Sequence, residues 1–378
     1  MSRHVCLVSD QAVPNITPVL DPDTRPAAVT LVVAPEMERQ ARWLKKVLRE
    51  ACGVPVERWP VADAWDAEHL LGRFMELLEA HDDLILNATC GTRPMSIAAF
   101  EAFRAYERPV FYVHPFTDEL FWLHPHDRPR HQLADRIKLR HFLLACGAEI
   151  KASADIRIPP AYRELTAYLV LRVEDFAGAL RVLNWYAASA RETLESEPIR
   201  SEYLHRPEFL ELLNRFQAVD ALRIRHGRLV FPDENARFFV NGGWLEEHVF
   251  SQVQQLRRRL PLIQDLARNL LIARDTGHGE VENELDVVFL ANNHLYLIEC
   301  KTRHFHPEEA DENGPGAEAI YKLDTLKEVL GGLHGRGILV SYLPLAEPDR
   351  RRAADLGIRV CEGRQIQDLP HIFREWII

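Results

Sequence analysis

The residues with the clearest potential for chemistry are Asp286, Glu299 and Lys301, which share the stretch ELDVVFLANNHLYLIECKT. Two apolar runs flank Asn292 and Asn293 in this stretch. The pattern predicts a β-hairpin with a two-residue turn, because Asn tolerates the positive φ that such turns need. Asp286 then lies directly opposite Glu299, and Lys301 projects from the same face because side chains alternate along a strand. Facing carboxylates destabilise a sheet, and a divalent cation between them would remove the repulsion.

This arrangement of Asp286, Glu299 and Lys301 resembles the D…E-x-K signature of restriction-endonuclease-like nucleases. The resemblance implies that both carboxylates bind Mg²⁺ or Mn²⁺, together with the main-chain carbonyl of Cys300, and that Lys301 orients the attacking water. A metal held in this way lowers the pKa of its water and offsets charge on the scissile phosphate. The lysine places a fixed positive charge where negative charge develops. An E-x-K triplet alone is common, and the alternative is a surface hairpin with an ordinary Glu–Lys face.

Length, charge and cysteine content limit the class of protein. The chain has 378 residues, which predicts two or three domains. Its net charge of −10 argues against passive coating of nucleic acid but is compatible with a nuclease whose acidic site binds metal. No apolar run approaches the roughly 20 residues that span a bilayer, and the N-terminus MSRHVCLVSD indicates a strand and not a signal peptide. The six cysteines are dispersed without CxxC spacing, so we expect no zinc site, no disulfide framework and a cytoplasmic location.

The N-terminal third alternates apolar strands with amphipathic helices. We expect helices at 36–50, 63–79 and 93–106, and strands at 5–9, 29–34, 54–61, 83–87 and 109–114. This alternation predicts an α/β domain with a mainly parallel, Rossmann-like sheet. No GxGxxG follows the first strand, which argues against a dinucleotide site.

Two strand-to-helix loops of this domain carry polar groups. In a doubly wound sheet the first and fourth strands are neighbours, and the crevice between their carboxyl ends binds ligands. The first loop contains Ser9, Asp10, Asn15 and Thr17, and the second, NATCGTRPM, contains Thr89, Gly91, Thr92 and Arg93. The second loop offers backbone N–H groups, hydroxyls and an arginine at a helix N-terminus, which suits phosphate. Alternatively, its threonines cap the helix and its glycine makes a turn.

The stretch NATCGTRPM closely resembles the N-x-T-G-G-T-K-x-M loop of CARF domains, the sensors of cyclic oligoadenylates in type III CRISPR immunity. It departs from that pattern at Cys90, which we expect to narrow the loop slightly, and at Arg93, which keeps the charge of the usual lysine but changes its geometry. The segments NGGWLEEHVF at 241–250 and AIYKLDTL at 319–326 resemble the GGWLE and YKL segments of CRISPR ancillary nucleases. Those nucleases fuse a CARF domain to a restriction-endonuclease-like domain, and the motifs occur here in the same order.

The resemblance implies a nuclease that cyclic tetra-adenylate activates and that cleaves DNA, RNA or both. A tetra-adenylate ring can have two-fold symmetry, as an isologous dimer does, so a homodimer with the ring on its axis is expected. The ring would contact the eight residues named above in the two loops. The second function class is a ligand-binding regulator with an inactive nuclease fold. The intact set of Asp286, Glu299 and Lys301 argues against that class.

Two further assignments follow from the resemblance. Glu246, with Glu247 as the other candidate, would match the acidic residue of the first nuclease helix. Lys322 in the YKL segment would approach the substrate phosphate, unless it is a lysine on the helix surface. We expect a CARF domain at 1–152, a connector at 153–240 and a PD-(D/E)xK nuclease domain at 241–378.

The connector and the C-terminal region have a simpler predicted structure. In the connector we expect helices at 161–194 and 207–218 and a hairpin that turns at His226-Gly227. In the nuclease domain we expect a mobile loop at 311–316, then a helix, a strand, a helix, a strand and a C-terminal helix.

Overall fold

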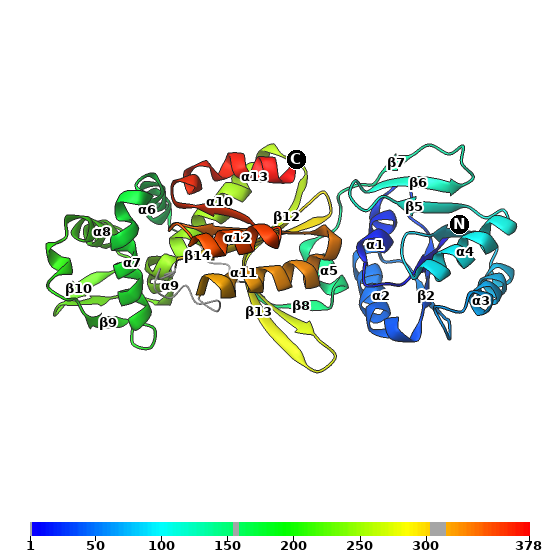
Figure 1. Ribbon diagram of the computed structural model, residues 1–378, viewed down its shortest axis with the longest axis horizontal. Helices are drawn as coiled ribbons and strands as arrows, with labels where there is room; N and C mark the ends of the chain where they lie inside the picture. Colours follow the sequence, from blue (N-terminus) through cyan, green and yellow to red (C-terminus); the bar gives the residue numbers. More distant parts are fainter. Residues whose placement is uncertain (1, 154–158, 303–314) are drawn as a thin grey trace.

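The computed structural model describes residues 2–153, 159–302 and 315–378. The N-terminal domain lies at one end of the molecule, a second sheet lies at the centre, and the connector, drawn in green, lies at the other end (Figure 1). Within the described residues, no helix is long and apolar enough to cross a membrane. The loop expected at 311–316 lies outside the described residues as far as residue 314, and a helix begins at Pro315.

The N-terminal domain is built on a seven-stranded sheet. Its strands are β1 (Arg3–Leu7), β2 (Ala28–Val33), β3 (Val56–Pro60), β4 (Leu84–Asn87), β5 (Val110–Val113), β6 (Glu119–His124) and β7 (His131–Gln132). Their spatial order is β3-β2-β1-β4-β5-β6-β7, and the first five strands pair in parallel. The predicted Rossmann-like sheet with neighbouring first and fourth strands is therefore confirmed. An antiparallel edge, formed by β6 and β7, was not predicted.

One helix of this domain corrects the sequence analysis. The segment expected to be a loop forms α1 (Val13–Leu20). Pro14 lies in its first turn, where a missing N–H costs no hydrogen bond. Pro18 leaves the carbonyl of Pro14 without a helical donor, and the side-chain amide of Asn87 donates to that oxygen at 2.8 Å. The other helices are α2 (Glu38–Cys52), α3 (Ala67–Ala80) and α4 (Arg93–Ala105), as predicted, and α5 (Leu139–Ala145).

The second sheet has six strands. They are β8 (Ala148–Ser153), β12 (Ile263–Asp275), β13 (Glu280–Ala291), β14 (His294–Lys301), β15 (Gly335–Ser341) and β16 (Arg359–Glu362), in the spatial order β16-β15-β14-β13-β12-β8. The expected domain boundary at residue 152 is wrong, because β8 pairs with β12 and belongs to this sheet. β8 is an edge strand whose side chains after Ala148 are exposed, so the sequence lacks the alternation that marks a half-buried strand.

The hairpin formed by β13 and β14 has the predicted turn and register. Val287 pairs with Ile298, as a two-residue turn at Asn292 and Asn293 requires. Both turn residues have positive φ, 50° and 56°, which matches the right-handed twist of the flanking strands.

The connector differs from the expectation in one respect. It contains α6 (Pro160–Leu171), α7 (Val173–Ser189), β9 (Glu195–Pro198), α8 (Pro207–Ala218), β10 (Arg223–Arg225) and β11 (Arg228–Val230). The single helix expected at 161–194 is wrong, because the chain breaks at Arg172 into α6 and α7. The helix at 207–218 and the hairpin that turns at His226-Gly227 are confirmed.

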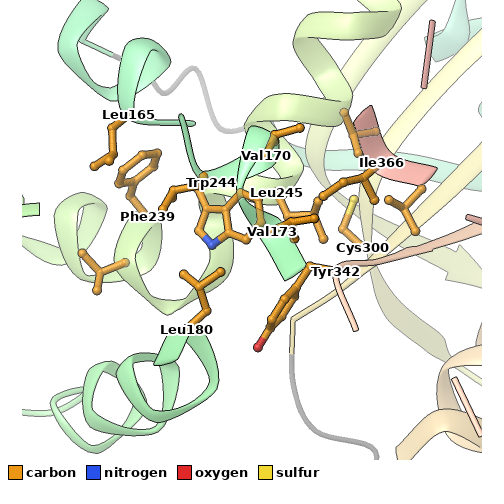
Figure 2. Close-up of a cluster of buried hydrophobic side chains, with 14 of the residues drawn as sticks. Leu165, Val170, Val173, Leu180, Phe239, Trp244, Leu245, Cys300, Tyr342 and Ile366 are labelled. Atoms are coloured by element: carbon orange, nitrogen blue, oxygen red, sulfur yellow. The ribbon is translucent and has the colours of Figure 1, made fainter. Parts of the chain in front are cut away.

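The connector and the central sheet share one hydrophobic core. Figure 2 shows Trp244, the first residue of α10 (Trp244–Arg259), among Val173 and Leu180 of the connector and Tyr342, which follows β15. The Trp244 side chain is fully buried, and its ring centroid lies 5.9 Å from that of Tyr342. The connector is therefore part of the central body and not a separate linker.

Replacement of this tryptophan tests the shared core. Trp244→Ala is expected to lower the free energy of unfolding by about 3–5 kcal/mol, because it removes a large buried ring and leaves a cavity. Denaturant unfolding measures the change. Trp185→Ala is the matched control, since Trp185 on α7 is 55% exposed and its loss is expected to cost about 0.5 kcal/mol or less. Equal losses in the two variants would contradict the shared core.

The NGGW segment before α10 packs against the end of β14. Gly242 has a φ of +110°, and a Cβ at this position would lie 2.2 Å from Thr302 Oγ1, so the approach requires glycine. This contact fixes the first turn of α10, which carries Glu246, beside the strand that carries Glu299. The remaining helices of the central body are α9 (Glu234–Phe238), α11 (Pro315–Leu326), α12 (Glu347–Asp355) and α13 (Leu369–Ile377).

Candidate functional site

Asp286, Glu299 and Lys301 lie together near one end of the β13–β14 hairpin. Val287 and Ile298 form the last ladder pair of the two strands. Asp286 lies one residue before Val287 and Glu299 one residue after Ile298, which puts their side chains opposite one another on one face of the sheet. The backbone N–H of Cys300 donates to Asp286 Oδ2 at 2.7 Å. Glu299 is only 5% exposed, and Lys301 Nζ lies 3.4 Å from its Oε1. The hairpin register therefore assembles two carboxylates and a lysine into one cluster.

A second lysine reaches the same carboxylate from α11. Lys322 Nζ lies 3.2 Å and 2.9 Å from the two carboxylate oxygens of Glu299. Burial lowers the pKa of the Lys322 ammonium, but the charges of Glu299 and Asp286 outweigh burial and hold the pKa above its ordinary value. Lys322 is therefore a charged member of this cluster and not a free lysine on the helix surface.

The two adjacent glutamates of α10 have different surroundings. Glu247 forms an ion pair with Arg268 of β12 and lies 3.9 Å from Arg163. Burial raises the pKa of Glu246 well above its ordinary value, and the nearby charges of Asp286 and Glu299 add to the rise. Glu246 is therefore the glutamate that lies beside the cluster, whereas Glu247 is held in an ion pair.

Sequence reasoning missed two polar neighbours of Glu246. Asn269 forms a hydrogen bond that lowers the pKa of Glu246, and the charge of Glu284 raises it. Asn269 lies on β12, which no local pattern predicted. Glu284 lies two residues before Asp286 on the same strand, so strand alternation alone would place it on the face of the cluster.

The donor set of this cluster fits a divalent cation. Burial and the charge of Glu299 raise the pKa of Asp286 to about 7, although Lys322, the Cys300 N–H and Lys301 oppose the rise. Carboxylates that lie close together away from solvent repel one another. A divalent cation between them removes this repulsion, and their oxygens are the ligands that a hard cation prefers. The sulfur of Cys300 does not compete as a donor, because burial and the nearby carboxylates raise the pKa of its thiol well above the ordinary value.

A different group of metal-ligand side chains lies in the N-terminal domain. The ligand atoms of Asp21, Asp23 and His131 all lie within 4.8 Å of one another. The carboxylate of Asp21 already accepts hydrogen bonds from the backbone N–H groups of Asp23, Thr24 and Ala134. His131 Nε2 lies 3.0 Å from Asp21 Oδ1. Asp21 therefore joins segments of the domain, and its partners within the protein account for the cluster.

The first polar loop follows β1. Ser9 is half-buried and Asp10 is exposed at the carboxyl end of this strand. Gln40 of α2 donates to Asp10 Oδ1 at 2.8 Å, so a neighbouring helix holds the aspartate. Both residues lie where the sequence analysis expects a ligand contact.

Asn15 and Thr17 correct that expectation. Both residues are fully buried in α1. The amide of Asn15 donates to the carbonyl oxygen of Leu7 at 2.9 Å and accepts a hydrogen bond from Asn87 at 3.0 Å. The hydroxyl of Thr17 donates to the carbonyl oxygen of Val13. These side chains hold the two loops together from inside the domain, and in this structure they do not lie at the loop surface.

The threonines of the second loop have two separate roles. Thr92 is the N-cap of α4: its hydroxyl accepts the N–H of Met95 at 3.3 Å and donates to the carbonyl of Ala64 at 2.7 Å. Thr89 does not cap the helix. Its hydroxyl accepts the N–H of Val113 at 2.9 Å, which connects the loop to the end of β5. The cap interpretation therefore holds for Thr92 and is wrong for Thr89.

The second loop also contains Gly91, Cys90 and Arg93, and the charged side chain of Arg93 is exposed. Gly91 has a φ of +86°, and a Cβ there would lie 2.8 Å from Leu7 Cβ. The thiol of Cys90 is buried and donates to the carbonyl of Gln11 at 3.3 Å, so it points into the fold and not onto the loop surface. Arg93 is exposed at the N-terminus of α4 and has no ion-pair partner among the residues that the structure describes. A guanidinium in this position is available to an anion.

Comparison with known families matches the N-terminal and the C-terminal parts of the chain. The Card1 CARF domain matches residues 3–142, and the Card1-like endonuclease domain matches residues 233–378. The first match ends before β8, in agreement with the place of that strand in the second sheet. No curated protein matches the chain at a significant level.

Solved structures also resemble the protein, and three of them illustrate the range of similarity. Protein VC1899 from Vibrio cholerae is 30% identical with a TM-score of 0.89, and the match covers 100% of this chain and 98% of that one. Can2 from Sulfobacillus thermosulfidooxidans, solved in complex with cyclic tetra-adenylate, is 29% identical with a TM-score of 0.85 and full coverage of both chains. A type III CRISPR defence DNA nuclease activated by cyclic oligoadenylate is 20% identical with a TM-score of 0.52. That match covers 92% of this chain and 47% of the other, and it shows a common fold alone.

The two domain matches and the full-length similarity agree with the geometry described above. A parallel sheet with a polar loop at its carboxyl edge precedes a mixed sheet that carries the carboxylate–lysine cluster. The chain therefore belongs to the Card1-like family and carries its CARF domain followed by its endonuclease domain.

Proposed function

We propose that the protein is a metal-dependent nuclease of type III CRISPR defence that cyclic tetra-adenylate activates. The observation that carries this proposal is the cluster of Asp286, Lys301 and the buried Glu299, in one chain with a CARF domain. The full-length similarity to Can2, whose structure contains the ring, supports cyclic tetra-adenylate as the activator.

The residues of the cluster have separate proposed roles. Asp286, Glu299 and the main-chain carbonyl of Cys300 would hold Mg²⁺ or Mn²⁺, which supplies a water of lowered pKa and offsets charge on the phosphate. Lys301 holds a positive charge beside the place where the nucleophile forms. Glu246 lies close enough to Asp286 and Glu299 for their charges to add to the rise of its pKa that burial causes, and a carboxylate of raised pKa would accept a proton within the site.

Lys322 provides a test within this cluster. Lys322→Met is expected to lower cleavage by about 10- to 100-fold, because a charge-assisted hydrogen bond to a buried carboxylate is typically worth about 1.5–3 kcal/mol. Single-turnover cleavage at saturating metal measures the loss. Lys327→Met is the control with the same change in charge, since Lys327 pairs with Asp324 and not with Glu299. Equal rates in the two variants would remove Lys322 from the site.

The ring is proposed to bind on the axis of a homodimer. Ser9, Asp10, Thr89, Gly91, Thr92 and Arg93 lie in the two loops at the carboxyl edge of the CARF sheet. A ring with two-fold symmetry meets the same loops of both copies when it lies on the dimer axis. One ring per two chains is the stoichiometry that titration calorimetry should give.

A cleavage assay tests the proposed function as a whole. Single- and double-stranded DNA and RNA are incubated with the protein in Mg²⁺ or Mn²⁺, with and without cyclic tetra-adenylate, and a chelator serves as the control. The proposal expects cleavage of a nucleic acid that depends on both metal and ring. Ring binding without cleavage of any substrate would instead identify a binding regulator.

A further inference from the structure

The turn of the hairpin that carries Asp286 and Glu299 is buried against the CARF domain. Its second residue, Asn293, is 0% exposed. The side-chain amide of Asn293 donates to Asp118 Oδ2 at 2.8 Å and to Asp135 Oδ1 at 3.2 Å. Both carboxylates belong to the CARF domain, so the tip of the nuclease hairpin is hydrogen-bonded to the other domain.

Gln264 of β12 completes this junction from the nuclease side. Its amide oxygen accepts the backbone N–H of Asn293 at 2.7 Å. Its Nε2 donates to Asn293 Oδ1 at 2.6 Å and to the carbonyl of Ile137 at 3.3 Å. Donor and acceptor atoms of the Asn293 side chain are therefore both paired, and a buried polar network that is fully satisfied holds one geometry.

The CARF side of the junction is connected to the second loop. Asp118 is the last residue of the turn between β5 and β6. Its backbone N–H donates to the carbonyl of His114 at 3.0 Å and closes this turn. The strand before this turn ends at Val113, whose N–H donates to Thr89 Oγ1 at 2.9 Å. A short segment, fixed at both ends, therefore joins the loop of Thr89 to the partner of Asn293.

We propose that Asn293 is a positioning residue through which the CARF domain sets the placement of the nuclease carboxylates, with Asp118 as its partner. This inference rests on the proposed function. Ring binding at the Thr89 loop shifts the end of β5 and hence Asp118. Asn293 follows Asp118, and β14, which runs from the turn to Glu299, transmits the displacement because packed elements move as units.

The charges at the junction make the Asn293 amide important. Burial raises the pKa of Asp118 to about 6, the Asn293 hydrogen bond lowers it, and the charge of Asp135 raises it. Without the amide, the buried carboxylate of Asp118 and the half-buried carboxylate of Asp135 would lie side by side without the donor group that they share. Loss of this amide should therefore weaken the connection between the hairpin turn and the CARF domain and leave the path through Gln264 to Ile137.

The turn itself provides a matched pair of variants. Asn293→Gly keeps the positive φ of a two-residue turn and removes the junction, because Asn-Gly is the preferred sequence for such turns. Asn292→Gly makes the same exchange at the neighbouring position, whose side chain makes no hydrogen bond to the CARF domain among those recorded for the described residues. Asp118→Asn keeps an acceptor for Asn293, and Asp118→Ala breaks the junction from the CARF side without touching the hairpin.

The experiment measures cleavage with and without cyclic tetra-adenylate in each variant of the full chain. The ratio of the two rates is expected to fall about tenfold or more in Asn293→Gly and Asp118→Ala, a typical allosteric coupling. Asn292→Gly and Asp118→Asn are expected to keep the wild-type ratio. Calorimetry supplies a readout without catalysis. By linkage, Mn²⁺ should strengthen ring binding in the wild type, and this dependence should disappear in Asn293→Gly.

The outcomes separate this inference from the function on which it rests. If Asn293→Gly and Asp118→Ala respond to the ring as Asn292→Gly does, the proposed role of Asn293 is wrong and the proposed function remains intact. A wild-type protein that the ring does not activate would overturn both.

Discussion

Glu299→Gln is expected to reduce cleavage by about a thousandfold or more, because a bound metal stabilises the transition state by several kcal/mol and each 1.4 kcal/mol is a factor of ten. Glutamine preserves the shape of the side chain but removes the negative charge that holds a divalent cation. It also removes the partner of Lys322 and Lys301, which both lie within 3.4 Å of a Glu299 oxygen. Metal-free binding of cyclic tetra-adenylate is expected to be unchanged, because the loops proposed to bind the ring lie in the other domain.

Single-turnover cleavage in Mn²⁺ measures the loss, and calorimetry without metal measures ring binding. Glu282→Gln is the matched control, since Glu282 is exposed on β13 and lies on the strand that carries Asp286. The control is expected to cleave at the wild-type rate. Undiminished cleavage by Glu299→Gln would exclude Glu299 as a metal ligand.

The carboxylate cluster was predictable because its determinants are local. Asn292 and Asn293 supply the positive φ of a two-residue turn, and the apolar alternation on either side fixes the strands. A one-residue change of register would turn every side chain of a strand to the other face. The turn therefore decides that Asp286 and Glu299 share a face, and no long-range contact is needed to infer it.

Other features depend on segments that are far apart in the sequence. α1 tolerates Pro18 because Asn87, on another strand, donates to the carbonyl that the proline leaves without a partner. β8 is a strand only because β12 pairs with it. The choice between Glu246 and Glu247 depends on how α10 is rotated, and the ion pair of Glu247 with Arg268 becomes visible only in three dimensions. Lys322 likewise meets Glu299 only after α11 packs against the sheet.

The second loop of the CARF domain, NATCGTRPM, fits both a helix cap and a ligand contact. A cap and a ligand contact both require a hydroxyl at a helix N-terminus, so residue type cannot separate them. The structure assigns the Thr92 hydroxyl to the cap and to Ala64. Arg93 is different, because its exposed guanidinium has no ion-pair partner within the described part of the chain. A single substitution at Arg93 is therefore a cleaner test of ring binding than one that also removes Thr92.

Arg93→Ala is expected to weaken binding of cyclic tetra-adenylate by about 10²- to 10⁴-fold. A hydrogen bond to a charged group is worth about 1.5–3 kcal/mol, and a ring on a two-fold axis loses it twice, once from each copy. Arg104→Ala is the matched control, because Arg104 is exposed in the last turn of the same helix and its loss changes the net charge equally. Titration calorimetry compares the two variants with the wild type. A loss of only about tenfold would indicate one arginine per ring and contradict the dimer arrangement, and an unchanged affinity would remove this loop from the ring site.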